Sequence, residues 1–263
     1  MTSTTPTRTP LVRRRAFGPV ALAVLFWLAV WHVAAAVVGR DFLLAPPWQV
    51  VVRLTELAAT AEFWSTAGTS LLRIAVGFTA AAVAGTIAAA LAGRYRWIEV
   101  LLAPLIVTIR SVPVVSFIIL VLLWADAAWL AAITSFLMVL PVMYTAVLGG
   151  VRNRDRQLLE AATVFGVPLW RRIRAIDVPS VMPFFVAASR TGVGLAWKSG
   201  VAAEVIGVAS GSIGGQLYQS KIFLDSASLF AWTVVIVGLS VACEKVALWA
   251  LARGERRMTG ALT

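Results

Sequence analysis

The sequence predicts an all-α integral membrane protein with about six transmembrane helices. Of its 263 residues, 60% are apolar and 13% are charged, whereas a soluble domain has about 45 to 50% apolar residues. The mean hydropathy is +0.88, and so few polar side chains cannot cover so much apolar surface. Runs of about 20 apolar residues, the length that a helix needs to cross a bilayer, recur along the chain. This composition excludes an ordinary soluble enzyme and a disordered chain.

Six segments have the length and composition of membrane spans. The first, 17–38, carries no formal charge, and it is longer than the apolar region of a cleaved signal peptide, which has about 7 to 15 residues. The remaining predicted spans are 66–92, 98–124, 127–151, 181–208 and 228–251. The last two contain charged side chains, so they are the least clear by hydropathy.

The basic residues predict which side of the membrane each connection faces, because Lys and Arg are retained in cytoplasmic loops. With the N-terminus inside, fifteen of them fall on inner segments, namely Arg8, Arg13, Arg14, Arg15, Arg94, Arg96, Arg152, Arg154, Arg156, Arg171, Arg172, Arg174, Arg253, Arg256 and Arg257. Three, Arg40, Arg53 and Lys221, fall on outer segments. Both termini are therefore predicted to be cytoplasmic. Since the inner residues occupy four separate segments, the net charge of +11 reflects topology and no nucleic acid partner is indicated.

The connections complete the predicted organisation. Residues 1–16 are expected to form a disordered cytoplasmic tail, and 252–263 a second cytoplasmic tail. In the external loop 39–65, the apolar spacing after the two prolines predicts a short helix at the membrane interface. The core transmembrane domain spans 66–251 and includes the long inner connection 152–180.

That inner connection carries the most specific motif of the chain. It contains Glu160-Ala161-Ala162, then three residues and Gly166, then nine residues and Ile176, and it ends with Val178-Pro179. This pattern resembles the E-A-A, three residues, G, nine residues, I-x-L-P signature of the permease subunits of bacterial ABC importers. Only Val178, in place of Leu, departs from it.

The resemblance implies a cytoplasmic coupling helix around 158–166, between spans four and five, that docks in a groove of a separate ATPase subunit. The coupling residues would be Glu160, Ala161, Ala162, Gly166, Ile176 and Pro179. The family further implies two permease copies, expected to form a homodimer, two ATPase copies, an external substrate-binding protein and a bacterial plasma (inner) membrane. ATP and Mg²⁺ would be bound by the ATPase, with no cofactor or metal on this chain.

The residue types of the motif agree with a docking role. Two alanines and a glycine give a helix a shallow flank that a partner can approach closely, and Glu160 offers a carboxylate to a basic residue. Pro168 prevents the helix from continuing. The alternative is a surface amphipathic helix whose alanines reflect helix propensity alone. The full spacing on an inner loop favours the coupling interpretation.

Further segments narrow the resemblance, which covers 44–257. The segments 44–50, 70–78 and 110–113 are similar to signatures of the nitrate, sulfonate and taurine permeases, although Ala45 and Pro46 depart from the first of them. This subgroup implies uptake of a small, anionic solute.

Polar side chains inside the predicted spans are candidates for the translocation path, because a charge at the bilayer centre costs about 2.5 to 3.5 kcal/mol. The candidates are Arg110, Lys198, Ser199 and Glu204. Lys198 has no acidic residue one helical turn away and would attract anions if it lined a path, but a structural role is equally compatible. Arg110 could instead pair with lipid headgroups or a partner. Arg190 and Glu244, at similar depths, predict a structural ion pair between spans five and six.

The sequence gives little support to other functions. It lacks a G-x-x-x-x-G-K-[ST] phosphate loop, so the chain is not expected to hydrolyse ATP. One cysteine and one histidine cannot build a disulfide framework or a zinc cluster. A secondary transporter or channel remains the alternative, for which Glu204 and Glu244 are the available mid-depth carboxylates. A membrane enzyme would depend on Asp155, Glu160 or Asp177, without an inner histidine.

Overall fold

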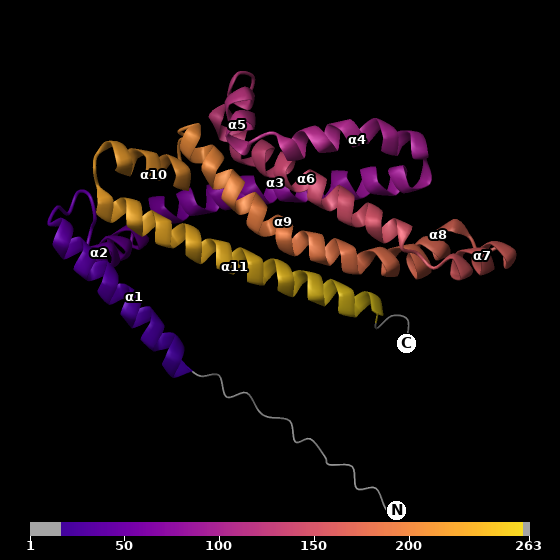
Figure 1. The fold of residues 1–263 in the computed structure, drawn as a ribbon, viewed down its shortest axis with the longest axis horizontal. Coiled ribbons are helices and arrows are strands. Elements are labelled where there is room, and N and C mark those ends of the chain that lie inside the picture. The colour runs from indigo at the N-terminus through magenta and orange to yellow at the C-terminus, as the bar shows by residue number, and fades with distance from the viewer. Residues whose placement is uncertain (1–16, 260–263) are drawn as a thin grey trace, which may run out of the picture.

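The computed structural model describes residues 17–259, with side chains over 21–250 and at Arg253, and this part of the chain is helical throughout, without strands (Figure 1). The predicted tail 1–16 and residues 260–263 lie outside it. The helices are α1 (Phe17–Val38), α2 (Pro47–Ala58), α3 (Ala61–Arg94), α4 (Arg96–Ser111), α5 (Val114–Leu122), α6 (Ala127–Arg152), α7 (Arg156–Val164), α8 (Leu169–Arg172), the π-helix η1 (Ile173–Asp177), α9 (Val178–Ile206), α10 (Ile213–Ile222) and α11 (Ser226–Thr259).

Four helices are long and apolar enough to cross a membrane: α1, α3, α6 and α11. They correspond to the first, second, fourth and sixth predicted spans. The third predicted span is not one straight helix, because α4 and α5 meet at a bend of 101°. Pro113 lacks a backbone N–H and forces the residue before it into an extended conformation, and Val112 accordingly has φ −79° and ψ 130°. Counted as one span, this bent pair gives five.

The fifth predicted span, α9, is 29 residues long, enough to cross a bilayer at about 1.5 Å per residue, but it is not among the helices that are apolar enough. Its charged residues, Arg190, Lys198 and Glu204, lower its hydropathy. Six spans and the cytoplasmic location of the termini therefore stay predictions. Two bounds also differ from expectation: α3 begins at Ala61 rather than near residue 66, and α11 continues to Thr259 through part of the predicted tail.

The core lies where α6 packs between α3 and α9 (Figure 1). Glycines allow the backbones to approach closely there, as small residues do between membrane helices. A Cβ added to Gly77 of α3 would lie 2.2 Å from the carbonyl oxygen of Ala132 on α6. One added to Gly200 of α9 would lie 2.7 Å from the Ser135 hydroxyl. These three helices therefore form the rigid centre of the chain.

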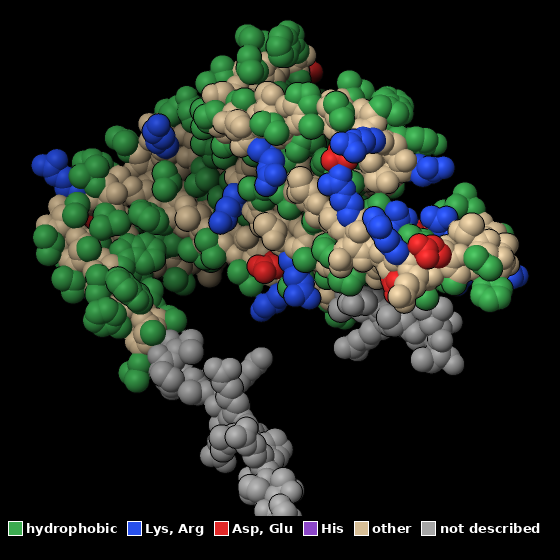
Figure 2. Space-filling model, turned by 45° about the vertical axis from the view of Figure 1, so that its right-hand side comes forward, with side chains coloured by type: hydrophobic (Ala, Val, Ile, Leu, Met, Phe, Trp, Pro, Cys, Tyr) green, Lys and Arg blue, Asp and Glu red, His purple; other side chains and the backbone are tan. Residues whose placement is uncertain are grey.

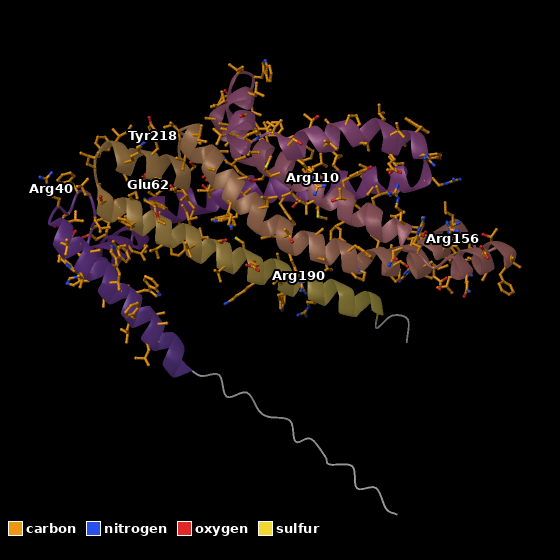
Figure 3. All side chains as sticks on the ribbon, viewed as in Figure 1. Arg40, Glu62, Arg110, Arg156, Arg190 and Tyr218 are labelled. Atoms are coloured by element: carbon orange, nitrogen blue, oxygen red, sulfur yellow. The ribbon has the colours of Figure 1, made fainter. Side chains whose placement is uncertain are left out.

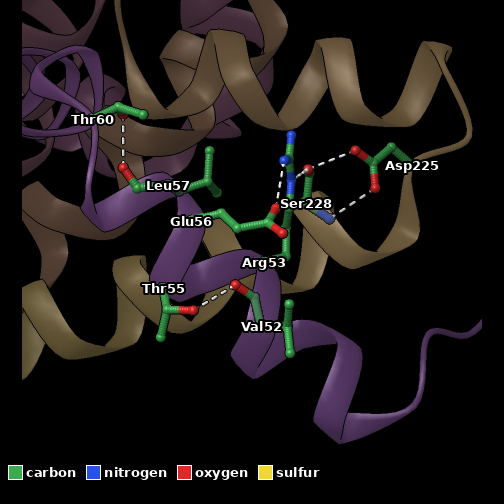
Figure 4. A network of polar contacts seen from close by, with 8 residues as sticks. All are labelled: Val52, Arg53, Thr55, Glu56, Leu57, Thr60, Asp225 and Ser228. Carbon is green, nitrogen blue, oxygen red and sulfur yellow. Dashed lines mark hydrogen bonds and ion pairs between the residues drawn. The ribbon is translucent and has the colours of Figure 1, made fainter.

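The helices at the N-terminus attach to the rest of the chain mainly through α11, although α2 also contacts α3. Arg53 of α2 donates its Nε–H to the Ser228 hydroxyl of α11 at 2.8 Å, and the Ser228 hydroxyl donates to Asp225 at 2.6 Å (Figure 4). The ring of Trp31 on α1 lies 5.3 Å from that of Phe230 on α11. Apart from this contact, α1 is almost entirely unburied within the chain, and its apolar side chains cover the lower left of Figure 2.

Candidate functional site

The predicted coupling segment folds as the short helix α7, which begins at Arg156 and ends at Val164, two residues earlier than expected. Asp155 precedes the helix and accepts a hydrogen bond from the backbone N–H of Gln157 at 2.8 Å. An aspartate side chain satisfies free N–H groups at this position and complements the positive end of the helix dipole. The start of α7 is thus encoded by its own sequence.

Gly166 determines how α7 ends. The N–H of Val167 donates to the carbonyl of Ala162 at 2.9 Å and that of Gly166 to Thr163 at 3.2 Å, which is the Schellman pattern of hydrogen bonds. Gly166 has φ +61°, a conformation that disfavours any side chain. A Cβ added there would meet no atom of this chain within 4 Å. Within this chain, the backbone conformation rather than a close contact therefore accounts for the glycine.

The helices α7 and α8, at the far right of Figure 1, expose large apolar side chains among charged ones. Ala162 is the one buried residue of α7, while Glu160 and Ala161 are exposed. The large exposed apolar side chains of this segment, which we call the apolar tip, are Leu158, Val164, Phe165, Val167, Leu169 and Trp170. Phe165 is 82% exposed and Trp170 72%. Several large apolar side chains exposed on one loop are typical of a docking site.

Ile176 and Pro179 lie where α8 joins α9. The backbone between them forms a π-helix, in which the N–H of Val178 donates to the carbonyl of Ile173, five residues before. Pro179 has no N–H to donate, so the wider turn occurs where the regular hydrogen-bond ladder is interrupted. Because α8, η1 and α9 follow one another without a loop, the end of the apolar tip is continuous with the long helix α9.

Asp177 and Arg154, which the sequence did not predict to pair, anchor this segment. Asp177 accepts a hydrogen bond from Arg154 at 2.5 Å, and Arg172 lies 3.9 Å from the same carboxylate. Arg154 also donates to the carbonyl of Val151 at the end of α6 at 2.6 Å. The carboxylate thus ties both ends of the coupling segment together. The sequence contained an indication of this contact, because Asp177 lies inside the motif and the preceding connection is rich in arginine.

The four residues predicted for a translocation path separate into two exposed and two buried. Arg110 on α4 and Lys198 on α9 are exposed on this chain, and neither forms an ion pair within 4.0 Å among the described residues (Figure 3). Lys198 shares its side of α9 with Thr191 and with Gly194, around which a Cβ would meet nothing within 4 Å. Ser199 is buried and donates to the carbonyl of Leu195 at 2.8 Å.

Glu204 is fully buried and joins three helices. Its Oε2 accepts hydrogen bonds from the Ser70 hydroxyl of α3 at 2.8 Å and from the N–H of Gly214 in α10 at 3.2 Å. The Ser70 hydroxyl in turn accepts from the N–H of Ile213 at 2.9 Å. Arg73 lies close enough to act electrostatically on the carboxylate. Glu204 therefore caps the N-terminus of α10 with a carboxyl oxygen, which satisfies an N–H group that has no partner within the helix.

The ion pair expected between Arg190 and Glu244 was wrong. Both side chains are exposed on this chain, and the ion pairs found within 4.0 Å in residues 21–250 do not include it. Figure 3 marks Arg190 on α9. Equal depth in two neighbouring helices was not sufficient, because both residues turn away from the contact between α9 and α11. The described part of the chain contains no group of three or more His, Cys, Asp or Glu that could hold a metal ion.

Comparison with known proteins identifies relatives over most of the chain. Residues 81–260 match the family described as "Binding-protein-dependent transport system inner membrane component". A permease protein named for aliphatic sulfonates transport in Escherichia coli (strain K12) is 32% identical over 206 residues, which cover 76% of each chain. The nitrate import permease protein of Synechococcus elongatus is 29% identical over 250 residues, covering 89% of this chain and 88% of that protein.

A third relative is named for a different solute. The riboflavin transport system permease protein of Chloroflexus aurantiacus is 27% identical over 194 residues, covering 72% of this chain and 70% of that protein. Relatives of nearly equal similarity are thus named for chemically different solutes. Sequence similarity at this level therefore supports the assignment as a permease much more strongly than it supports any particular solute.

Proposed function

The chain belongs to the family of binding-protein-dependent transport system inner membrane components, as an ABC importer permease of the nitrate, sulfonate and taurine type, and from this premise we propose how it couples and transports. It is a multi-pass protein of the inner membrane, and its relatives are transport subunits rather than enzymes. In the proposal it takes up a small anionic solute, with six spans and both termini in the cytoplasm.

Docking of the ATPase is assigned to α7 and the apolar tip. The observation that carries this assignment is the group of large apolar side chains left uncovered on a segment whose ends are fixed by Asp155, Gly166 and Asp177. Burying such side chains against a partner is worth roughly 25 cal/mol for each Å² removed from water. Glu160, exposed on the same helix, would add a charge-assisted contact to a basic residue of the ATPase.

Movement of the docked segment would reach the membrane through α9. The partner ATPases bind ATP and Mg²⁺, and their closure displaces the coupling segments of two permease copies. Since α8, η1 and α9 are continuous, a displacement of the apolar tip would tilt α9 rather than be absorbed in a loop. The π-helix at Ile173–Asp177 is the natural place for such a bend.

The translocation path is proposed to run along the exposed side of α9, between this chain and a second copy. Thr191, Gly194 and Lys198 recur there at spacings of three and four residues, so they face one direction of the helix. Small side chains leave room for a solute, and a lysine attracts an anion. An external binding protein would deliver the solute to this path.

The docking proposal is tested by introducing a charge into the apolar tip. Phe165→Asp should insert normally but lose the ATPase on purification, whereas Phe223→Asp, whose phenylalanine is similarly exposed at 78% on the opposite end of the chain, should retain it. Glu160→Arg should weaken retention by one or two decades, since a charge-assisted contact is worth about 1.5 to 3 kcal/mol. Wild-type ATPase stoichiometry in both Phe165→Asp and Glu160→Arg would refute the assignment.

The path proposal is tested at Lys198. Lys198→Met should reduce uptake of sulfonate or nitrate while assembly and the basal ATPase rate stay unchanged. Lys221→Met, which removes an equally exposed lysine from α10, is the matched control and should transport normally. Unchanged uptake in Lys198→Met would remove this residue from the path without affecting the docking proposal.

A further inference from the structure

A polar pocket of about 480 Å³ lies where α3 ends, α4 begins and α6 ends. Its charged lining residues are Arg94, Arg96, Glu99 and Arg152. Figure 2 shows Lys and Arg side chains gathered over this half of the molecule. In the predicted orientation the pocket opens at the cytoplasmic surface of the membrane. Arg152 is the first residue of the inner connection 152–180, but no residue of the pocket belongs to α7, to the apolar tip or to the exposed side of α9.

The charges of the pocket do not cancel. Glu99 forms an ion pair with Arg152, the last residue of α6. Arg94 and Arg96 make no ion pair within 4.0 Å in the part of the chain that the structure describes. Three guanidinium groups against one carboxylate leave a net charge of +2 (3 − 1). A concave site of this charge favours an anion.

The start of α4 adds donors to the same site. Tyr95 stands at the N-cap position and provides no side-chain hydrogen bond. The N–H of Ile98 donates to the carbonyl of Tyr95 at 3.1 Å, and no capping side chain accepts from the earlier N–H groups of Arg96 and Trp97. These two N–H groups lie at the positive end of the helix dipole, where a phosphate group is favoured.

The surroundings of the pocket resemble the boundary between headgroups and acyl chains. Tyr95 and Trp97 are exposed beside it, and aromatic residues of this kind are enriched at the membrane interface. One turn further along α4, Val100 and Leu101 are also exposed, by 66% and 64%. A ligand held in the pocket would therefore have an apolar surface next to it along α4. A free inorganic anion has no apolar part that could be buried against such a surface.

We propose that this pocket binds the headgroup of an anionic phospholipid, with Arg94, Arg96 and Arg152 holding the phosphate and the exposed apolar side of α4 receiving the acyl chains. Basic pockets between membrane helices on the cytoplasmic side bind anionic headgroups. The lipid phosphate competes with Glu99 for Arg152. Because the Glu99 carboxylate opposes lipid binding, removing it should strengthen binding. Removing the carboxylate of an ordinary surface ion pair would have no such effect.

The proposal is tested on the purified full-length permease by native mass spectrometry, with phosphatidylglycerol and with phosphatidylcholine of the same acyl chains. Phosphatidylglycerol should bind more tightly. Arg96→Gln should weaken its binding about fivefold, which corresponds to about 1 kcal/mol for one basic residue near an anionic headgroup. Arg253→Gln, which removes an exposed arginine of α11 outside the pocket, should leave binding unchanged. Glu99→Gln should strengthen binding, because it frees Arg152.

Each alternative result overturns the proposal. Equal binding of the two lipids would show that no anionic headgroup is recognised. Equal effects of Arg96→Gln and Arg253→Gln would show general attraction by net charge. Weaker binding in Glu99→Gln would assign the ion pair a purely structural role. Displacement of phosphatidylglycerol by inorganic phosphate would identify a free-phosphate site, whereas the lipid proposal expects no displacement, since the acyl contacts to α4 are retained.

Discussion

The two short helices α7 and α10 lie at opposite ends of the molecule (Figure 1). They differ in how many of their first backbone N–H groups find acceptors within the protein and in how many of their residues are buried. The first N–H groups of α10, those of Ile213, Gly214 and Gly215, are accepted by side chains of Ser70, Glu204 and Ser212 respectively. All three helix residues are buried. In α7, by contrast, one N–H is capped by the neighbouring Asp155 and one residue is buried.

This difference indicates that α10 is stabilised by contacts within the chain, whereas α7 needs a partner to bury its surface. Removing α10 from its site would uncover polar groups of α3 and α9, which is costly in a low-dielectric interior. Separating α7 from the rest of the chain would break an ion pair at Asp177 and few apolar contacts. The apolar tip beside α7 thus gains its burial from outside the chain, as the docking proposal requires.

The largest effect is expected from removing the buried carboxyl group of Glu204. Glu204→Ala leaves the N–H of Gly214 and the hydroxyl of Ser70 without their acceptor inside the protein, each at about 1 to 3 kcal/mol. The melting temperature in detergent should fall clearly. Glu160→Ala, the matched change at an exposed glutamate of α7, should leave the melting temperature unaltered. If Glu204→Ala instead melts normally but no longer transports, Glu204 serves the path rather than the fold.

A smaller effect is expected at the end of α7. Gly166→Val places a branched side chain at φ +61°, which costs about 1 to 2 kcal/mol for an L residue. Because α7 has few contacts, the cost should appear as faster hydrogen exchange of α7 and lower ATPase retention, with little change in global melting. Gly238→Ala, at a helical glycine with nothing within 4 Å, is the control and should change neither. Protected α7 amides in Gly166→Val would contradict this account.

The connection between α2 and α11 should respond to pH through Asp225. Burial opposes its ionisation, but hydrogen bonds from Ser228 and the charge of Arg53 outweigh it and hold the pKa of Asp225 below its ordinary value. A lowered pKa in the folded state stabilises above the ordinary pKa of aspartate, about 3.9, and this contribution is lost as pH falls through the lowered value. Melting of the wild type should therefore show an acid dependence that Asp225→Asn reduces. An unchanged pH profile would rule out this role.

The smallest effect is expected at Val208, which ends α9 as Gly166 ends α7. The N–H of Ala209 donates to the carbonyl of Glu204 at 3.1 Å, and Val208 has φ +51°, which a branched residue rarely adopts. Val208→Gly should relieve this strain and raise stability, by roughly 1 kcal/mol or less once the added freedom of the unfolded chain is subtracted. A lower melting temperature would mean that the valine side chain contributes packing that exceeds the strain.

The sequence by itself determined the class of the molecule and its most specific segment. Apolar runs near the length of a bilayer crossing recur because a membrane helix must satisfy its backbone internally, and α1, α3, α6 and α11 follow those runs. The spacing from Glu160 to Pro179 identified the family, since its residues act locally: Gly166 sets a turn and Pro179 interrupts a hydrogen-bond ladder. Such effects depend on nearby residues alone.

The tertiary structure alone decided which polar residues are partners. Glu204 and Ser70 are 134 positions apart, and their pairing depends on how α3 and α9 pack around α6, which no local pattern specifies. Depth along a helix predicted a contact between Arg190 and Glu244, but rotation about each axis turned them apart. The 101° bend between α4 and α5 likewise needed more than Pro113, because a proline permits a range of kinks and neighbouring helices select one.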